Sequence, residues 1–338
     1  YMSIFVVDKT DDDDDGDDDD DADDDGAVFD DDDASGRPKE IPLLVCHGAE
    51  NGPRLWINGA THGDEPEGAF SIFRLFDQLD PAQVSGTVVG VPAMNVPAFE
   101  AGKRGDPLDS FTYDMNRMYP GQADGYPTER AAWAHWVGMK DACDLQIAVH
   151  SGGEHSYLAH MIFASDNPQS LELAAAMGEA WDLVFRSGVG GGNPASKMAG
   201  LGKAGITVEL GGNCRTLTSD FYTVADDLAA GYLNVMRHYG MTHGDATYAP
   251  EWRMGHQEAL LAPASGMWVG EEKMVFETEM SSGTPLGKIY SLYGDVTAEV
   301  VAPEDGVVFG LRSRPSVLEG EWCCFFGIID EVRSDLIP

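Results

Sequence analysis

Four short apolar runs in this chain each end within a few residues of a histidine, an asparagine or a glutamate. The pairs are Leu55–Ile57 with His62, Thr87–Val91 with Asn95, Leu145–Val149 with His150, and Ile206–Val208 with Glu209. In an open α/β sheet, ligands gather outside the carboxyl ends of the strands. The pattern therefore predicts an α/β fold, a sheet layered by helices, with these polar side chains along one rim.

The intervening sequence predicts the rest of this architecture. A further strand is expected at Ile41–Cys46. Pro66 suits the first turn of a helix, and the expected helices cover residues 66–78, 128–142, 167–185 and 219–238. Residues 101–127 are expected to form a long loop, and loops over a rigid sheet are where binding residues tend to lie.

After about residue 250 the pattern changes to short alternating runs between Gly, Pro and Asp turns. Examples are Met274–Glu279, Val296–Val301 and Gly306–Gly310, and they predict a small all-β domain. Its layout resembles the β-sandwich of biotinyl and lipoyl carriers, but no lysine stands in a Met-Lys-Met turn, so we expect no prosthetic group. The predicted division is a disordered acidic tail at 1–36, a catalytic domain at 37–250 and a β domain at 251–338.

The chain is strongly acidic, with a formal net charge of −37 over 338 residues. The first 36 residues hold 18 aspartates and Lys9, a net −17, so the remaining 302 residues still carry −20. The tract Asp11–Asp33 is expected to be disordered, because it has too little apolar area to offset the entropy of ordering; a calcium site is the weaker alternative. A surface this acidic argues against nucleic acid and anionic membranes as partners.

Two further features bear on the environment of the protein. The body of the chain is poor in lysine and rich in acid, which resembles proteins of salt-saturated cytoplasm. The five cysteines are odd in number and contain no Cys-x-x-Cys, which favours reduced thiols and a cytoplasmic location. No apolar run approaches the length of a membrane span. The sequence leaves open whether the protein forms a homo-oligomer.

The polar residues at the predicted rim have the composition of a catalytic zinc site. Two imidazoles and one carboxylate leave the fourth position of zinc free for water. The available residues are His62, Glu65, His150 and Glu209, and the glutamate that does not bind zinc is then free to take the proton of that water. A His-x-x-Glu pair alone is a weak signal, since it arises often by chance.

The motifs in order resemble the succinylglutamate desuccinylase and aspartoacylase family of the zinc carboxypeptidase superfamily. The matching stretches lie at residues 58–65, 95–104, 114–121, 150–153 and 208–211. The resemblance implies a zinc-carboxypeptidase-like mixed sheet layered by helices and one Zn²⁺ per chain. It implies that His62, Glu65 and His150 bind the zinc and that Glu209 is the general base and acid. By the same resemblance Arg104 polarises the scissile carbonyl, and Asn116 and Arg117 bind the substrate carboxylate.

The chain departs from the family pattern at Ala148, where the family usually has an aspartate two residues before the third ligand. A metal-bound histidine nearly always donates its second N–H to an acceptor, so His150 must find another one. Asp64, Glu67 and Asp114 are expected to brace loops or begin helices. Tyr290 and Tyr293 are expected to be half-buried strand residues, with a role in the site as the alternative.

Three functions compete at this point. The first is a zinc-dependent deacylase of a small N-acyl amino acid, with N-acetyl-diaminobutyrate as one candidate by resemblance only. The second is a carboxypeptidase with the same chemistry on a peptide, which an appended β domain would disfavour by crowding out a long chain. The third is a non-catalytic binding protein on the same scaffold, and the presence of all three ligands and Glu209 argues against it.

Overall fold

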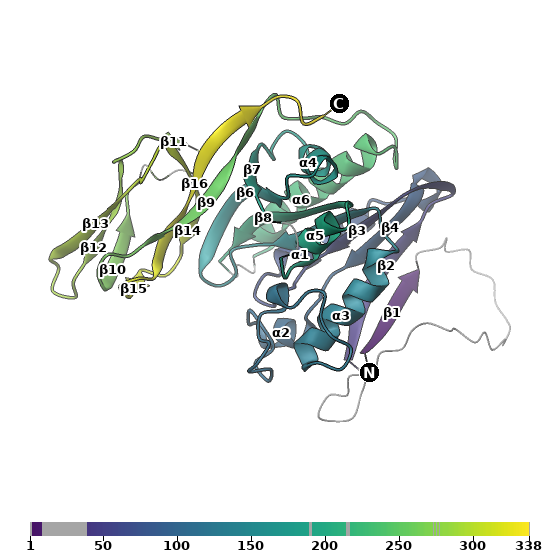
Figure 1. The fold of residues 1–338 in the computed structure, drawn as a ribbon, viewed down its shortest axis with the longest axis horizontal. Coiled ribbons are helices and arrows are strands. Elements are labelled where there is room, and N and C mark those ends of the chain that lie inside the picture. The colour runs from purple at the N-terminus through teal and green to yellow at the C-terminus, as the bar shows by residue number, and fades with distance from the viewer. Residues whose placement is uncertain are drawn as a thin grey trace.

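A mixed sheet of twelve strands runs through the chain (Figure 1). The computed structural model describes residues 2–8, 39–188, 191–213, 217–272, 274, 276 and 278–337. In spatial order the strands are β1 (Met2–Asp8), β2 (Lys39–His47), β4 (Ser85–Val91), β3 (Glu50–Asn58), β5 (Leu145–His150), β8 (Ala204–Gly212), β6 (Ser156–Ala164), β7 (Leu183–Arg186), β9 (Trp252–Leu261), β16 (Trp322–Arg333), β14 (Gly306–Arg312) and β11 (Glu279–Met280).

The centre of this sheet is parallel. Strands β4, β3, β5 and β8 pair in parallel, so their carboxyl ends meet at one rim. These four strands and β2 confirm all five predicted strands. Burial on both faces explains the near-continuous apolar runs, and every residue of β5 is buried. Along β3 the side chains alternate, with Leu55 and Ile57 packing on one face and Trp56 on the other.

Helices cover both faces of the parallel strands. The helices α1 (Glu67–Phe76), α4 (Pro168–Ala175) and α6 (Thr218–His238) contribute to the core that contains Ile57. The helices α3 (Pro127–Lys140) and α5 (Pro194–Gly200) pack on the other face. The described residues also form the short helix α2 (Val96–Ala101) and the 3₁₀ turns η1 (Pro81–Gln83) and η2 (Met115–Arg117). Of these elements, only η2 interrupts the predicted loop that follows Ala101.

Three of the four predicted helices are confirmed, as α1, α3 and α6. The prediction of one helix over 167–185 is wrong in its second half. The helix α4 ends at Ala175, Gly178 has a left-handed φ of 106°, and Leu183–Arg186 forms β7 instead. The apolar run after Gly178 pairs with β6, so sheet pairing overrides the helical pattern there.

The region after residue 250 is all β, as predicted. A second sheet has the order β13 (Val296–Val301), β12 (Pro285–Tyr290), β10 (Gly266–Gly270) and β15 (Ser316–Val317). It lies at the opposite end of the molecule from β1 (Figure 1). Buried side chains such as Trp268, Leu286 and Phe326 join it to β9, β14 and β16. The likeness to biotinyl and lipoyl carriers stays a prediction.

This β region is continuous with the main sheet. Strand β6 pairs along one part with β7 and along another with β14, as Ile162 with Val184 and Leu158 with Gly310. Because β7 also pairs with β9, and β16 joins β9 to β14, five strands form a closed ring. The ring crosses the expected boundary at residue 250, so we keep 37–250 and 251–338 only as a proposed division.

Two sequence-based expectations concern the remaining parts of the chain. The strand β1 falls inside the range 1–36 that was expected to be disordered, so that expectation is wrong for residues 2–8. The aspartate tract at 11–33 lies outside the described residues. Among the described residues, Cys46, Cys143, Cys323 and Cys324 are buried and form no disulfide. In the described part of the chain, no helix is long and apolar enough to cross a membrane.

Candidate metal centre and active-site cleft

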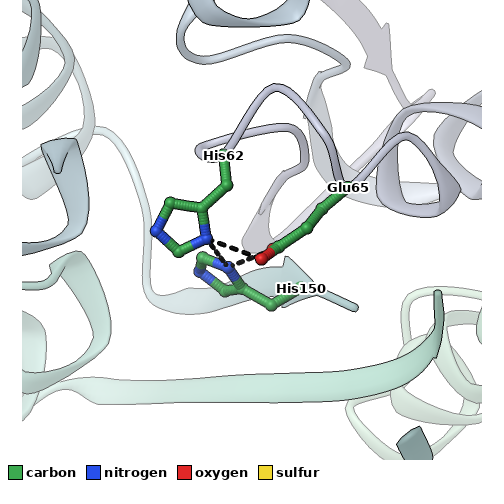
Figure 2. A group of neighbouring side chains, drawn as sticks. All are labelled: His62, Glu65 and His150. Carbon is green, nitrogen blue, oxygen red and sulfur yellow. Dashed lines mark hydrogen bonds and ion pairs between the residues drawn. The ribbon is translucent and has the colours of Figure 1, made fainter. Parts of the chain in front are cut away.

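Three side chains meet at the rim of the parallel strands (Figure 2). His62 lies on the loop after β3, Glu65 lies just before α1, and His150 is the last residue of β5. One potential ligand atom from each lies within 4.8 Å of the others, and all three residues are buried. Nδ1 of His62 is 2.8 Å from one oxygen of Glu65, and Nδ1 of His150 is 2.7 Å from the other.

The protonation pattern of these groups fits a divalent cation. The two Nδ1 atoms lie only 3.1 Å apart, so they cannot both carry a proton without a close contact between the hydrogens. On the other side of its ring, His62 directs Nε2 to Oδ1 of Asp114 at 3.1 Å. Neutral imidazoles that share a metal through Nδ1 remove the conflict and leave the Nε2–H of His62 free to donate to Asp114.

The electrostatics of the cluster favour a positive charge between these side chains. Burial lowers the pKa of His62, but the charge of Glu65 and the hydrogen bonds to Asp114 and Glu65 outweigh it and raise the pKa to about 9. Burial raises the pKa of Glu65, but the two histidines outweigh it and hold the pKa far below its usual range. Glu65 is therefore ionised, and the cluster suits a cation.

Asp114 is a site residue whose task the sequence did not reveal. We expected it to brace a loop, and it does accept a hydrogen bond from the backbone N–H of Asn116. It also contacts His62 and forms an ion pair with Arg104 at 3.1 Å. Its position two residues before Asn116, inside the motif at 114–121, is the only signal that links it to the site.

Ala148 stands where the family usually has an aspartate, and His150 has no carboxylate partner at its second ring nitrogen among the described residues. Ala148 is fully buried on β5. The Nε2 atom of His150 is buried as well, and it has no hydrogen-bond partner among the described residues. The second ring nitrogen of His150 therefore lacks the carboxylate support that Asp114 gives to His62.

Glu209 lies beside the candidate metal ligands. It is the register partner of His150 on the neighbouring parallel strand, and it lines the same cleft as His62 and Glu65. Burial, reinforced by the negative charge of Glu65, raises the pKa of Glu209 well above its usual value. A carboxyl group with a raised pKa can both accept and return a proton near neutral pH.

The three predicted substrate-binding and polarising residues line the same cleft of about 630 Å³. Arg104 lies 3.6 Å from Glu65, next to the ligand cluster. Arg117 is more exposed, and its guanidinium donates to the backbone carbonyl of Asn116 at 3.1 Å. The side-chain oxygen of Asn116 is buried and has no partner among the described residues. The lining of the cleft holds three arginines, Arg104, Arg117 and Arg186, beside the two carboxyl groups of Glu65 and Glu209, and guanidinium groups favour a substrate that carries a carboxylate.

The opposite wall of the cleft comes from the closed ring of strands. Phe309 and Phe325 lie there, together with His256 and Gln257 of β9 and Arg186 of β7. None of these was predicted as a site residue. Tyr290 and Tyr293 are not among the residues that line the cleft, and the side chain of Tyr293 is 95% exposed.

The chain is similar to known proteins over most of its length. The succinylglutamate desuccinylase/aspartoacylase catalytic domain model matches residues 51–239. The N-alpha-acetyl-L-2,4-diaminobutyric acid deacetylase of Halomonas elongata is 29% identical over 311 residues, covering 88% of this chain and 87% of that protein.

Two solved structures are similar over most of their length. The product-bound ectoine utilization protein EutE (DoeB) of Ruegeria pomeroyi is 25% identical with a TM-score of 0.73, covering 85% of this chain and 89% of that chain. A succinylglutamate desuccinylase/aspartoacylase of Rhodobacter sphaeroides is 26% identical with a TM-score of 0.72, covering 86% and 89%. With the family model matching more than half of its residues, this chain belongs to the succinylglutamate desuccinylase/aspartoacylase family.

Proposed function

We propose that this protein is a zinc-dependent hydrolase that removes the acyl group from an N-acyl amino acid. The observation that carries the proposal is the convergence of Nδ1 of His62, Nδ1 of His150 and the carboxylate of Glu65, with Glu209 on the adjacent strand. Two histidines and one carboxylate are a known ligand set for catalytic zinc. When bound, zinc supplies a Lewis acid and lowers the pKa of a coordinated water.

The residues of the chain then divide the remaining tasks. Glu209 takes a proton from the attacking water and returns it to the leaving amine, which its raised pKa favours. Arg104, next to Glu65, stabilises the negative charge that develops on the carbonyl oxygen. Arg117 and Asn116 bind the substrate carboxylate, since a guanidinium fork matches a planar carboxylate.

The substrate class follows from the cleft and from the relatives. A cleft of about 630 Å³ lined by three arginines suits a small molecule that carries a carboxylate. The relative in Halomonas elongata is named for deacetylation of N-alpha-acetyl-L-2,4-diaminobutyric acid. We therefore propose N-acetyl amino acids as substrates, with N-acetyl-diaminobutyrate as the first to test. The acidic, lysine-poor composition supports a cytoplasmic protein adapted to high salt.

A substrate screen of the zinc-loaded protein at molar salt tests this function. N-acetyl and N-succinyl amino acids are compared with short peptides, and we expect turnover of the acyl amino acids. Phe309 and Phe325 of the β region line the cleft of about 630 Å³, and we expect this wall to make peptides poor substrates. Preferred hydrolysis of peptides would identify a carboxypeptidase instead. Bound zinc without turnover of any acyl amide would identify a binding protein.

A further inference from the structure

The carboxylate of Glu67 lies directly behind the metal-ligand cluster and contacts the ends of two strands. The hydroxyl of Ser151 donates to Oε2 of Glu67 at 2.6 Å, and the backbone N–H of Gly212 donates to Oε1 at 3.0 Å. Glu67 is the first residue of α1 and is only 4% exposed. One buried side chain thus joins the start of α1 to the carboxyl ends of β5 and β8.

Each of these contacts is close to a proposed catalytic group. Ser151 follows His150 directly, and its own N–H donates to the ligand Glu65 at 3.3 Å. Gly212 is three residues after Glu209, at the end of β8. The bridge through Glu67 therefore spans the two strands that present His150 and Glu209.

The end of β8 is shaped for this contact. Gly212 has a φ of +126°, and a Cβ there would lie 2.2 Å from the carbonyl oxygen of Ser156. Only glycine fits this turn without a shift of the backbone. The turn directs the N–H of Gly212 to Glu67, so the position of the chain after Glu209 depends on the carboxylate.

Packing alone does not call for a carboxylate at this point. Burying a charged or polar group is costly unless its hydrogen bonds are replaced. A separate cavity of about 220 Å³, lined by Glu67, Tyr157 and Val224 among others, borders the side chain. A neutral side chain of the same length would fill the space with less desolvation cost.

We propose that Glu67 is a positioning residue that holds the ligand cluster and Glu209 in register by binding Ser151 and Gly212. The inference rests on the proposed function for the role of Glu209. The contact with Ser151 also reaches the ligands themselves, so zinc affinity gives a measure that does not require activity.

The test uses the full chain with Glu67→Met, which keeps the length of the side chain and removes both acceptor oxygens, together with Ser151→Ala and the double variant. Ser71→Ala is the matched control, because Ser71 is a buried hydroxyl on the same helix that contacts Gly68 and Tyr232 instead. Zinc affinity is measured by competition with a chelator, kcat and KM on an N-acetyl amino acid at saturating zinc, and the melting temperature by thermal unfolding.

We expect Glu67→Met and Ser151→Ala each to lower zinc affinity and kcat by a factor on the order of 10 to 100, with KM little changed. The melting temperature should fall no further than in Ser71→Ala, which also removes buried hydrogen bonds. The double variant should be no worse than Glu67→Met alone, because both changes break the contact between Glu67 and Ser151.

The proposal is overturned if Glu67→Met lowers only the melting temperature and matches Ser71→Ala in zinc affinity and kcat. It is also overturned if the effects of the two single changes on zinc affinity add. If the parent protein hydrolyses no N-acyl amino acid, the proposed function fails, and the zinc measurements still decide the role of Glu67.

Discussion

His150 and Glu209 are register partners on the parallel strands β5 and β8. Adjacent parallel strands place such partners side by side on the same face of the sheet. A proposed metal ligand and the proposed general base therefore leave the sheet at the same level, and the rigid core beneath them fixes their spacing.

Glu209→Gln keeps the size of the side chain and removes the base. We expect kcat to fall by a factor on the order of 10² to 10⁴, while zinc content stays near that of the parent. Steady-state kinetics and metal analysis check this. Glu172→Gln, a change near His238, is the control and should leave kcat unchanged. A near-normal kcat in Glu209→Gln would show that another group moves the proton.

Asp114→Asn removes the carboxylate that faces Nε2 of His62. The loss of this support should weaken zinc binding by a factor on the order of 10 to 100, whereas His62→Ala should abolish binding. Chelator competition measures both. Asp124→Asn is an exposed change in the same loop and should bind zinc like the parent. Normal zinc content in His62→Ala would refute the ligand assignment.

Arg117→Ala removes the more exposed arginine of the cleft. If its contact with the substrate carboxylate is equally strong in the ground and transition states, the change raises KM and leaves kcat nearly constant. Kinetics on a carboxylate-bearing substrate and on its amide derivative give the comparison. An unchanged ratio of kcat/KM between the two substrates would contradict the role of Arg117.

The stability of the fold should increase strongly with salt. Outside the first 36 residues the chain carries −20, and at molar salt a Debye length of about 3 Å screens this repulsion. The melting temperature should therefore rise between low and molar salt, and deletion of residues 11–33 should change the rise only modestly. A flat response to salt would exclude the salt-adapted interpretation.

His135 should make the fold sensitive to mild acid. Trp56 donates to its Nε2 at 2.9 Å, so the ring is neutral and its Nδ1–H donates to Tyr119 at 2.8 Å. Burial lowers the pKa of His135 to about 3 from an ordinary value of 6.5. Between pH 3 and pH 6.5 the unfolded chain binds more protons than the folded chain. The stability that neutral, buried His135 contributes is therefore complete above pH 6.5 and is lost as the pH falls towards 3.

Unfolding measured by denaturant at several pH values tests the role of His135. The parent and His135→Gln should differ in the slope of unfolding free energy against pH below 6.5, by up to about 1.4 kcal/mol per pH unit. Equal slopes would show that His135 does not titrate in this way.

The sequence by itself determined the features that depend on neighbouring residues. Apolar runs predicted the strands at 41–46, 54–58, 87–91, 145–149 and 206–208, and helix-start residues predicted α1 and α3, because these signals act within a few residues of the chain. The order of the motifs predicted that His62, Glu65, His150 and Glu209 meet at one rim. Parallel strands end at the same edge, so this followed from the fold class.

Only the tertiary structure decided the contacts that depend on register between distant segments. Asp114 reaches His62 across 52 residues, Glu67 reaches Gly212 across 145 residues, and β6 closes the ring with β14. The end of α4 and the formation of β7 also depended on pairing with β6. A one-residue change of register turns each strand side chain to the opposite face, and local sequence patterns do not specify which partner a strand will find.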